Sequence, residues 1–257
     1  MSNVLSFSGG IDSTSLLLKL LCKKTDIYAL TFNYGQKHSI EIEFAKQNIS
    51  HLTDFGFNIK HQIIDISDLV NILESSLTNN DIEVPEGHYL DENMKSTFVP
   101  NRNAIFSSII YAYAISIYKR TNKHVTLSLG VHAGDHLIYP DCRPNFYKQI
   151  MESFKIGNWD SEYIDIYLPY IDINKSDIIK DGIKSCKILG LDYKSIYKNT
   201  LTTYFPDKNG ASTGKTGSDI ERILAFHEIG VKDPGLYLKP WEELLEYALQ
   251  SEENINS

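Results

Sequence analysis

The residues best suited to chemistry form one short run near the N-terminus, SGGIDS at residues 8–13. Two glycines allow a sharp turn and let backbone N–H groups approach a ligand closely. If a helix begins directly after them, its positive dipole end and unpaired N–H groups favour an anion such as phosphate. Asp12 would repel bare phosphate, so its carboxylate suits a Mg²⁺ bridge or a helix cap. The candidate nucleotide-binding residues are Ser8, Gly9, Gly10, Ile11, Asp12, Ser13 and Thr14. An ordinary glycine turn capped by Asp12 is the alternative.

A second glycine-rich run, GASTGKT at residues 210–216, has the end of a Walker A loop but not its beginning. The pattern GxxxxGK[ST] requires a glycine where Asn209 stands, and no apolar strand precedes the run. We therefore exclude it as a nucleotide site.

The elements around the first run alternate in type. Apolar runs predict strands at residues 4–7, 27–32, 58–64 and 125–129, and helical periodicity predicts helices at 13–21, 39–52 and 103–118. Strands separated by helices indicate βαβ units and a mainly parallel sheet with right-handed crossovers. Ligands bind at the carboxyl ends of such strands, which is where SGGIDS lies. The predicted fold class is α/β.

Two stretches lack core residues and predict loops. Residues 78–95 are acidic and turn-rich, as a surface loop or lid would be, and residues 202–217 are polar and rich in glycine. Ser218 and Glu221 have the spacing of a capping box ahead of a helix that ends at Gly230. Pro240 precedes a last helix over residues 241–249. We therefore divide the chain into an α/β domain (1–190), a C-terminal lobe (191–250) and a frayed tail (251–257).

Composition narrows the functional classes. The chain has 257 residues, with 25 Lys+Arg against 33 Asp+Glu and a net charge of −8, which disfavours an extended nucleic-acid surface and a tRNA-modifying role. Three scattered cysteines without a CxxC motif argue against a disulfide scaffold. No uninterrupted apolar stretch approaches the roughly 18 residues of a membrane span, and no signal-like N-terminus is evident. We expect a cytoplasmic protein.

Six further strings follow in order and narrow the identity: TFNYGQ (31–36), SSLT (75–78), FVPNRN (98–103), GVHAGD (130–135), YPDCRPNF (139–146) and INKSDIIKDG (173–182). Together with SGGIDS they resemble the 7-cyano-7-deazaguanine synthase family, QueC, over residues 3–237. The resemblance implies a PP-loop ATP pyrophosphatase with a Rossmann-like adenine-nucleotide α-hydrolase (HUP) sheet, a small helical C-terminal lobe and a homodimeric state.

The resemblance also assigns roles. In this family ATP converts the carboxylate of 7-carboxy-7-deazaguanine into an acyl-adenylate, releasing pyrophosphate, and an amine then attacks the acyl carbon. ATP and Mg²⁺ are the implied cofactors, and the implied catalytic residues are Asp12, Ser13 and Lys175, with Lys175 neutralising charge on the α-phosphate. The implied base pocket consists of Arg102, Asp135, Tyr139, Asp141, Arg143 and Phe146.

Plainer roles stay open for several of these residues. Arg143 can serve as a structural partner of Asp141, because a planar guanidinium suits a carboxylate. Lys175 can be a surface lysine of a helix, and Cys142 a small buried residue. No third metal ligand accompanies His132 and His136, so we interpret them as neighbouring polar residues rather than as metal ligands. Tyr34 and Gln36 can simply finish a strand.

The sequence departs from the family near its C-terminus. The family carries four zinc-binding cysteines there, but this chain has Thr203, Thr213, Thr216 and Asp219 at those positions. Neutral hydroxyls do not replace thiolates around Zn²⁺. We predict no zinc site and a lobe held by other packing.

The missing cysteines bear on function. They suggest a divergent branch, such as the QueC-like enzymes of anti-phage defence operons of the CBASS type, where the acyl group can be joined to a protein. We therefore expect a protein or peptide amine as acceptor. The alternatives are a nitrile-forming synthase that uses ammonia, and a non-catalytic nucleotide-binding module.

Overall fold

Five parallel strands form the centre of the molecule, in the order β3-β2-β1-β4-β5. The computed structural model describes residues 1–36, 40–70, 73, 75, 97–132, 134, 139–203 and 206–256. The parallel pairing of all five strands confirms the expected Rossmann-like sheet. The strands are β1 (Ser2–Ser6), β2 (Asp26–Asn33), β3 (Ile59–Asp65), β4 (Val125–Ser128) and β5 (Ile164–Tyr167). The helices are α1 (Ile11–Leu21), α2 (Ile40–Asp54), α3 (Ser67–Val70), α4 (Arg102–Thr121), α5 (Pro144–Gly157), α6 (Lys175–Leu189), α7 (Tyr193–Tyr197), α8 (Gly217–Glu228) and α9 (Trp241–Asn256), with the 3₁₀ turns η3 (Pro140–Cys142) and η4 (Ser161–Tyr163).

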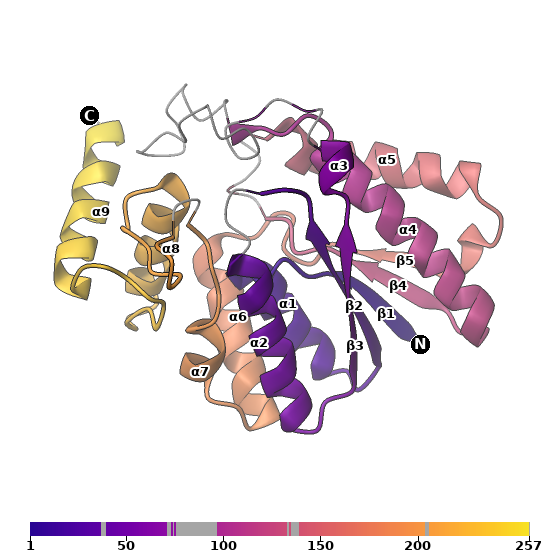
Figure 1. Cartoon of the computed structure of the whole chain (residues 1–257), viewed down its shortest axis with the longest axis horizontal. Helices are drawn as coiled ribbons and strands as arrows, with labels where there is room; N and C mark the ends of the chain where they lie inside the picture. The colour runs from indigo at the N-terminus through magenta and orange to yellow at the C-terminus, as the bar shows by residue number, and fades with distance from the viewer. Residues whose placement is uncertain are drawn as a thin grey trace.

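Both faces of the sheet are covered by helices, as Figure 1 shows. Leu5 of β1 and Phe7 of the following turn pack with α1, α2 and α6 in one core cluster. Val4, the residue directly before Leu5, belongs instead to the cluster under α4 and α5. Successive strand residues point to opposite faces, so the continuous apolar run of β1 is the pattern that burial on both faces requires.

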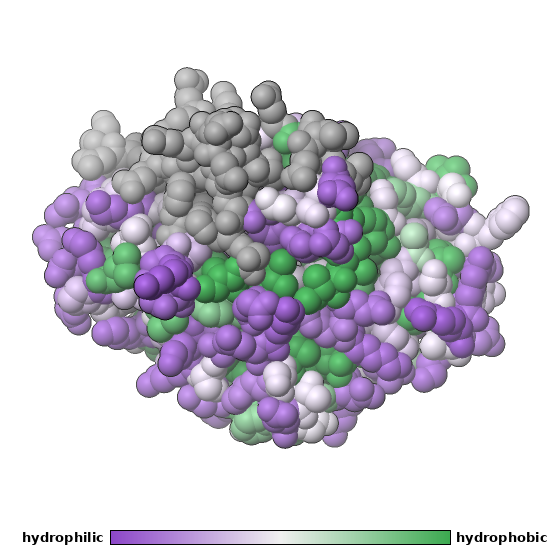
Figure 2. All heavy atoms as spheres, in the orientation of Figure 1, coloured by the Kyte–Doolittle hydropathy of each residue, from purple (hydrophilic) through white to green (hydrophobic). Residues whose placement is uncertain are grey.

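On the outer surface, Figure 2 shows hydrophilic side chains over most of the lower half of this face and hydrophobic ones gathered in a band across its middle.

The strand order reverses beside β1. The chain goes from β1 to β2 and β3 on one side, then returns to β4 and β5 on the other. A parallel sheet opens a crevice at the carboxyl ends of the strands where its order reverses in this way. The segment between β1 and α1 lies at that point, and so do residues 129–131 after β4. The topology therefore creates the site that the sequence pattern anticipates.

The C-terminal segment packs as helices against α6. Ile220 and Ile223 of α8 form a small core cluster with Leu244 and Ala248 of α9. The capping box of α8 lies two residues earlier than predicted: Thr216 is the N-cap and Asp219 completes the box, instead of Ser218 and Glu221. Helix α9 extends to Asn256, past its predicted end at residue 249 and through most of the segment expected to fray. The proposed division at residue 190 stays a prediction.

The sequence patterns missed several elements. Strand β5 is only four residues long, and α5 and α6 were not identified as helices although their sequences are amphipathic. Gly230, by contrast, follows α8 with a φ of +72°, in agreement with its predicted role as a stop. None of the helices in the described ranges is both long and apolar enough to cross a membrane.

Candidate active site

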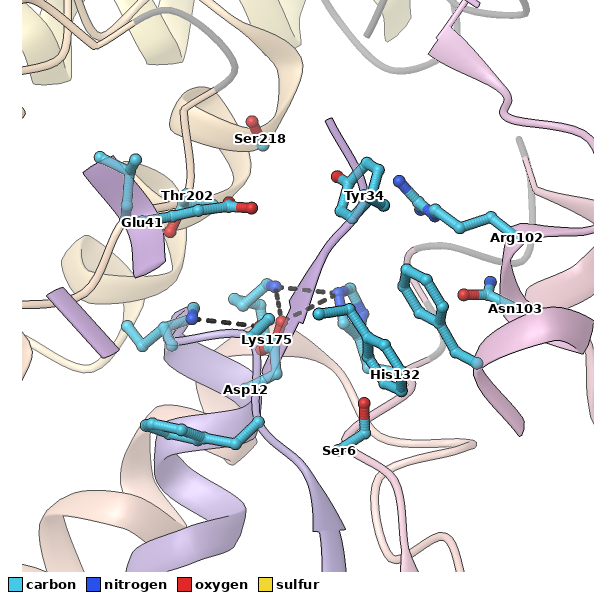
Figure 3. Close-up of a pocket in the computed structure, with 17 residues that line it drawn as sticks. Ser6, Asp12, Tyr34, Glu41, Arg102, Asn103, His132, Lys175, Thr202 and Ser218 are labelled. Carbon is cyan, nitrogen blue, oxygen red and sulfur yellow. Dashed lines mark hydrogen bonds and ion pairs between the residues drawn. The ribbon is translucent and has the colours of Figure 1, made fainter. Parts of the chain in front are cut away.

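A cavity of about 280 Å³ opens at the carboxyl end of β1, between α1 and α4 (Figure 3). Glu41 and Thr202 enter it from one side, and Tyr34, Arg102 and Asn103 from the other. Its lining includes residues of both α2 and α4, which pack on opposite faces of the sheet. The lining residues are Ser6, Phe7, Ser8, Gly10, Ile11, Asp12, Phe32, Tyr34, Glu41, Arg102, Asn103, Phe106, His132, Lys175, Leu201, Thr202 and Ser218.

The predicted phosphate loop forms one wall of this cavity. Gly9 has a φ of +84°, and a Cβ there would lie 2.9 Å from the Cβ of Ala45, so conformation and space both require glycine. The Ser8 and Ser13 hydroxyls are 3.1 Å apart, and Ser8 Oγ also accepts the N–H of Gly10. The N-cap residue of α1 is Gly10, which has no side chain with which to cap the helix. The geometry leaves a helix N-terminus beside serine hydroxyls, which suits a phosphate group.

Lys175 lies at the centre of the charged cluster. It is the first residue of α6, only 5% exposed, and its Nζ lies 2.7 Å from Asp12 Oδ2 and 2.8 Å from His132 Nε2. Glu221 Oε2 lies 3.4 Å from the same nitrogen. This excludes the interpretation of Lys175 as a surface lysine. It also identifies His132 as a polar neighbour of Lys175, whereas His136 lies outside the described residues.

Asp12 is held ionised. Burial alone would raise the pKa of its carboxyl group, but the charges of Lys175 and His132 and the Lys175 hydrogen bond outweigh it and hold the pKa below the usual value. Its Oδ1 is buried and has no hydrogen-bond partner among the described residues. A carboxylate oxygen is the ligand type that Mg²⁺ prefers, so this unsatisfied oxygen fits an ion shared with nucleotide phosphates.

Aromatic rings form the opposite wall. Phe32 of β2 and Phe106 of α4 stack with centroids 4.2 Å apart and ring planes at 4°. Tyr34 tilts against Phe106 at 5.5 Å, and the Arg102 guanidinium lies 5.7 Å from the Tyr34 ring centre. Burial raises the pKa of Tyr34 to about 12, so the phenol stays neutral. A flat apolar wall edged by a cation suits a planar ring that carries an anionic group.

The rest of the predicted base pocket is divided. Tyr139 and Cys142 are buried and line an adjoining cavity, which also contains Arg102 and Ser13. Asp141 is buried and accepts the backbone N–H of Asn103, so it supports the start of α4 rather than lining either cavity. Arg143 and Phe146 were also predicted to belong to this pocket. Arg143 is exposed and Phe146 is half-buried, and neither lines these cavities.

Two further predicted residues stand apart. Thr14 is wholly buried in α1 and is not among the residues that line the cavity, and its role as a phosphate donor stays a prediction. Asp135 lies outside the described residues, as do residues 78–95.

Of the residues at the family's zinc-cysteine positions, Thr203, Thr216 and Asp219 lie close together. Asp219 is buried and accepts the Thr216 hydroxyl at 2.6 Å, with Ser212 and Thr203 as further hydrogen-bonding side chains. Burial raises the pKa of Asp219 despite these bonds. Threonine hydroxyls and one carboxylate do not fit Zn²⁺, which takes thiolate or imidazole ligands in structural sites. No group of three or more His, Cys, Asp or Glu side chains that could hold a metal exists within the described ranges.

Sequence reasoning missed several lining residues. Glu41 is the second residue of α2 and Phe106 lies in α4, and the sequence predicted each only as part of a helix. Glu221 reaches Lys175 from α8, 46 positions along the chain, which no local pattern indicates. Position in the sequence is the signal that could have found Tyr34 and Asn103. Tyr34 lies in a string that follows a predicted strand, and Asn103 lies where a predicted helix begins.

Comparisons with known proteins identify a family model, named relatives and a solved structure to which this chain is similar. The model of the family described as "Queuosine biosynthesis protein QueC" matches residues 2–230. A protein named 7-cyano-7-deazaguanine synthase from Caldicellulosiruptor saccharolyticus is 42% identical over 234 residues, covering 91% of this chain and 94% of that protein. One of the same name from Hahella chejuensis is 43% identical over 233 residues, covering 90% of each. A solved structure of NMN synthetase from Francisella tularensis covers 98% of this chain and 85% of its own, with 16% identity and a TM-score of 0.42.

Proposed function

This chain belongs to the queuosine biosynthesis protein QueC family, and from that premise we propose that it activates the carboxylate of 7-carboxy-7-deazaguanine with ATP and joins the acyl carbon to nitrogen. The observation that carries the proposal is the cavity itself. It brings the SGGIDS loop, the Lys175 cation and a flat aromatic wall together within one opening. It is the arrangement expected of an ATP-dependent ligase of the PP-loop type.

The first half-reaction needs positioning and charge stabilisation. A carboxylate oxygen of the substrate attacks the α-phosphorus of ATP, and the bond to the β-phosphate oxygen breaks, giving an acyl-adenylate and pyrophosphate. Lys175 turns from Asp12 and His132 toward the α-phosphate as charge develops there. Ser8, Ser13 and the N-terminus of α1 donate hydrogen bonds to the departing phosphates. The Asp12 carboxylate would hold Mg²⁺, and the ion would supply further neutralisation of the phosphate charge.

The second half-reaction delivers nitrogen. An amine attacks the acyl carbon and AMP leaves. With ammonia the product is an amide, whose oxygen a second ATP activates before AMP departs to leave the nitrile. The names of the curated relatives support ammonia as the acceptor better than the protein amine expected from the missing cysteines. Ammonia is therefore our proposal, and transfer to a protein amine is the competing outcome of the test.

The test is a product assay with the purified full-length chain, ATP, Mg²⁺ and 7-carboxy-7-deazaguanine. With ammonia we expect AMP, pyrophosphate and the amide or nitrile base by mass spectrometry. Release of ADP would contradict the proposal, and an absence of any turnover that depends on the deazapurine would favour a non-catalytic nucleotide-binding module. AMP release accompanied by a mass increment on an added protein, with no base product from ammonia, would assign a protein acceptor.

The matched control is the Asp12→Asn variant, which keeps the shape of the side chain but removes its charge. We expect its deazapurine-dependent AMP release to fall to background while its thermal unfolding stays cooperative. The homodimer implied by the resemblance stays a prediction, which light scattering on the same preparation tests.

A further inference from the structure

We propose that Glu41 is the proton acceptor for the attacking amine in the second half-reaction. The inference rests on the proposed function, because it concerns the amine that follows the adenylate. Glu41 is the second residue of α2, and its side chain lines the cavity on the side opposite Arg102 and Tyr34. An acyl-adenylate seated between the phosphate loop and the aromatic wall would have its acyl carbon between these two sides. An amine approaching that carbon would therefore meet Glu41.

Gln36 positions the Glu41 carboxylate. Gln36 Nε2 donates to Glu41 Oε1 at 2.7 Å, and Gln36 Oε1 accepts the backbone N–H of Tyr34 at 2.9 Å. The amide thus links the end of β2 to the start of α2 and fixes the carboxylate relative to the strand end. The Gln36 amide is neutral, and its hydrogen bond orients the carboxylate but does not overcome the rise in its pKa, whereas Lys175 holds the pKa of Asp12 below its usual value. A base needs such a fixed position but also the freedom to take up a proton.

The other basic groups in this lining are already engaged. Asp12 Oδ2 is ion-paired with Lys175. His132 uses both ring nitrogens, Nε2 toward Lys175 at 2.8 Å and Nδ1 toward the backbone N–H of Gly134 at 3.0 Å. Asp12 and Glu41 are the carboxylates among the described lining residues, so Glu41 is the one that the phosphate chemistry does not use.

The environment suits a base that works near neutral pH. Burial raises the pKa of Glu41 to about 7, while the Gln36 hydrogen bond and the charge of Arg102 oppose that rise. A base poised near the working pH is the most effective one. The titratable and charged groups that face the cavity around it are Asp12, Tyr34, Arg102, His132 and Lys175, with Glu43 and Lys46 on the exposed part of its own helix.

The step balances as follows. The nitrogen lone pair of the amine forms a bond to the acyl carbon, and the bond from that carbon to the phosphate oxygen breaks, with its electron pair leaving on AMP. The nitrogen becomes positively charged as it attacks. One of its protons moves to Glu41, leaving a neutral amide and a protonated carboxyl group, which then loses its proton to water.

The test separates the two half-reactions in Glu41→Gln. Pyrophosphate exchange into ATP, dependent on 7-carboxy-7-deazaguanine, needs no amine and reports only the first half. We expect the variant to keep exchange within about threefold of the wild type, while amide formation from ammonia falls by about 10²–10⁴-fold, the usual range for removal of a general base. With rates expressed per concentration of neutral ammonia, the wild-type rate should rise with pH through about 7, and the variant's rate should not.

Two matched variants complete the design. Glu43→Gln removes an exposed carboxylate from the same turn of α2 and should change neither reaction. Glu41→Asp keeps the charge but shortens the side chain, and should restore part of the transfer rate. A parallel loss of exchange and transfer in Glu41→Gln, or unchanged transfer, would overturn the assignment. Absence of exchange in the wild-type enzyme would instead overturn the proposed function, and the inference with it.

Discussion

Opposite charges held close together define the phosphate end of the cavity. Lys175 is nearly enclosed yet faces Asp12, Glu221 and His132, so its charge is compensated before any nucleotide binds. A buried cation of this kind costs little reorganisation when it turns to a phosphate, because its solvent has already been removed. The same compensation keeps Asp12 ionised, which its proposed role as a Mg²⁺ ligand requires.

Replacing Lys175 with methionine should remove the cation while keeping the length of the side chain. We expect the rate of pyrophosphate exchange to fall by about 10²–10³-fold, the loss typical of one preorganised charge. Lys180→Met, on the exposed part of the same helix and paired with Asp177, is the control. A loss of less than about threefold in Lys175→Met would show that Lys175 does not stabilise the α-phosphate.

The Glu41 carboxyl group should also leave a signature in stability. Its pKa rises from 4.5 to about 7 on folding, so the folded state binds the proton more tightly than the unfolded state. Ionisation therefore costs stability as the pH rises from 4.5 through 7. Glu41→Gln should match the wild type at pH near 4 and exceed it above pH about 7 in urea unfolding. Equal free energies of unfolding at both pH values would contradict the buried, uncompensated position of this group.

Among the helices, α1 and α6 position the two charged partners. They pack closely along one face of the sheet, with Ser15 of α1 donating to or accepting from the Tyr197 hydroxyl at 2.7 Å. Gly182 of α6 makes this approach possible, since an added Cβ would overlap the Tyr197 hydroxyl and lie 2.7 Å from Ser15 Oγ. The distance between Asp12 and Lys175 therefore depends on a packing contact two turns away.

Gly182→Ala tests that contact. We expect a loss of about 1–3 kcal/mol in the free energy of unfolding, because the overpacked methyl group must push the helices apart. Pyrophosphate exchange should slow as well. Gly157→Ala, at the end of α5 with no atom within 4 Å of the added carbon, should leave both quantities unchanged or slightly raise stability. Urea unfolding of the two variants in parallel makes the comparison.

On the scale of the molecule, a buried ion pair ties the C-terminal helices to the rest. Arg222 of α8 binds Asp233 through Nε and Nη2, at 2.7 and 2.9 Å, and also donates to the carbonyl oxygens of Tyr197 and Thr200. Tyr237 donates to the same Asp233 carboxylate. These bonds join α7, α8 and the segment before α9.

Arg222→Ala should therefore cost about 3–5 kcal/mol of stability, because Asp233 would remain buried without its partner. Arg222→Met combined with Asp233→Leu should cost less than the sum of the two single changes, since it removes both charges together. Arg120→Ala, on the exposed end of α4, is the surface control. Thermal and urea unfolding of these variants, including the single changes Arg222→Met and Asp233→Leu, measure the losses. Additive losses in the double variant would contradict a coupled pair.

The zinc prediction belongs to the same scale. With hydroxyls around Asp219, we expect metal analysis of the purified chain to find far less than one zinc ion per chain. Adding 1,10-phenanthroline should not lower Tm. Zinc at about one ion per chain, with a Tm that falls on chelation, would contradict the proposed hydrogen-bonded replacement.

By itself the sequence determined the local features of this protein. Residues 8–13 and the alternating apolar runs predicted the turn, the strands beside it and the parallel sheet, because turn chemistry and periodicity are properties of neighbouring residues. The capping box of α8 was misplaced by two residues, since Thr216 and Ser218 are equally good cap types and only the backbone decides between them.

Only the tertiary structure decided which distant side chains share the site. Lys175 meets Asp12 across 163 positions, and Glu41 faces Arg102 because α2 and α4 cover opposite faces of the sheet. It also removed Thr14, Arg143 and Phe146 from the lining, since burial and direction depend on packing and not on residue type. Charge compensation inside the cavity is likewise a matter of distance between side chains, which a chain acquires only when it folds.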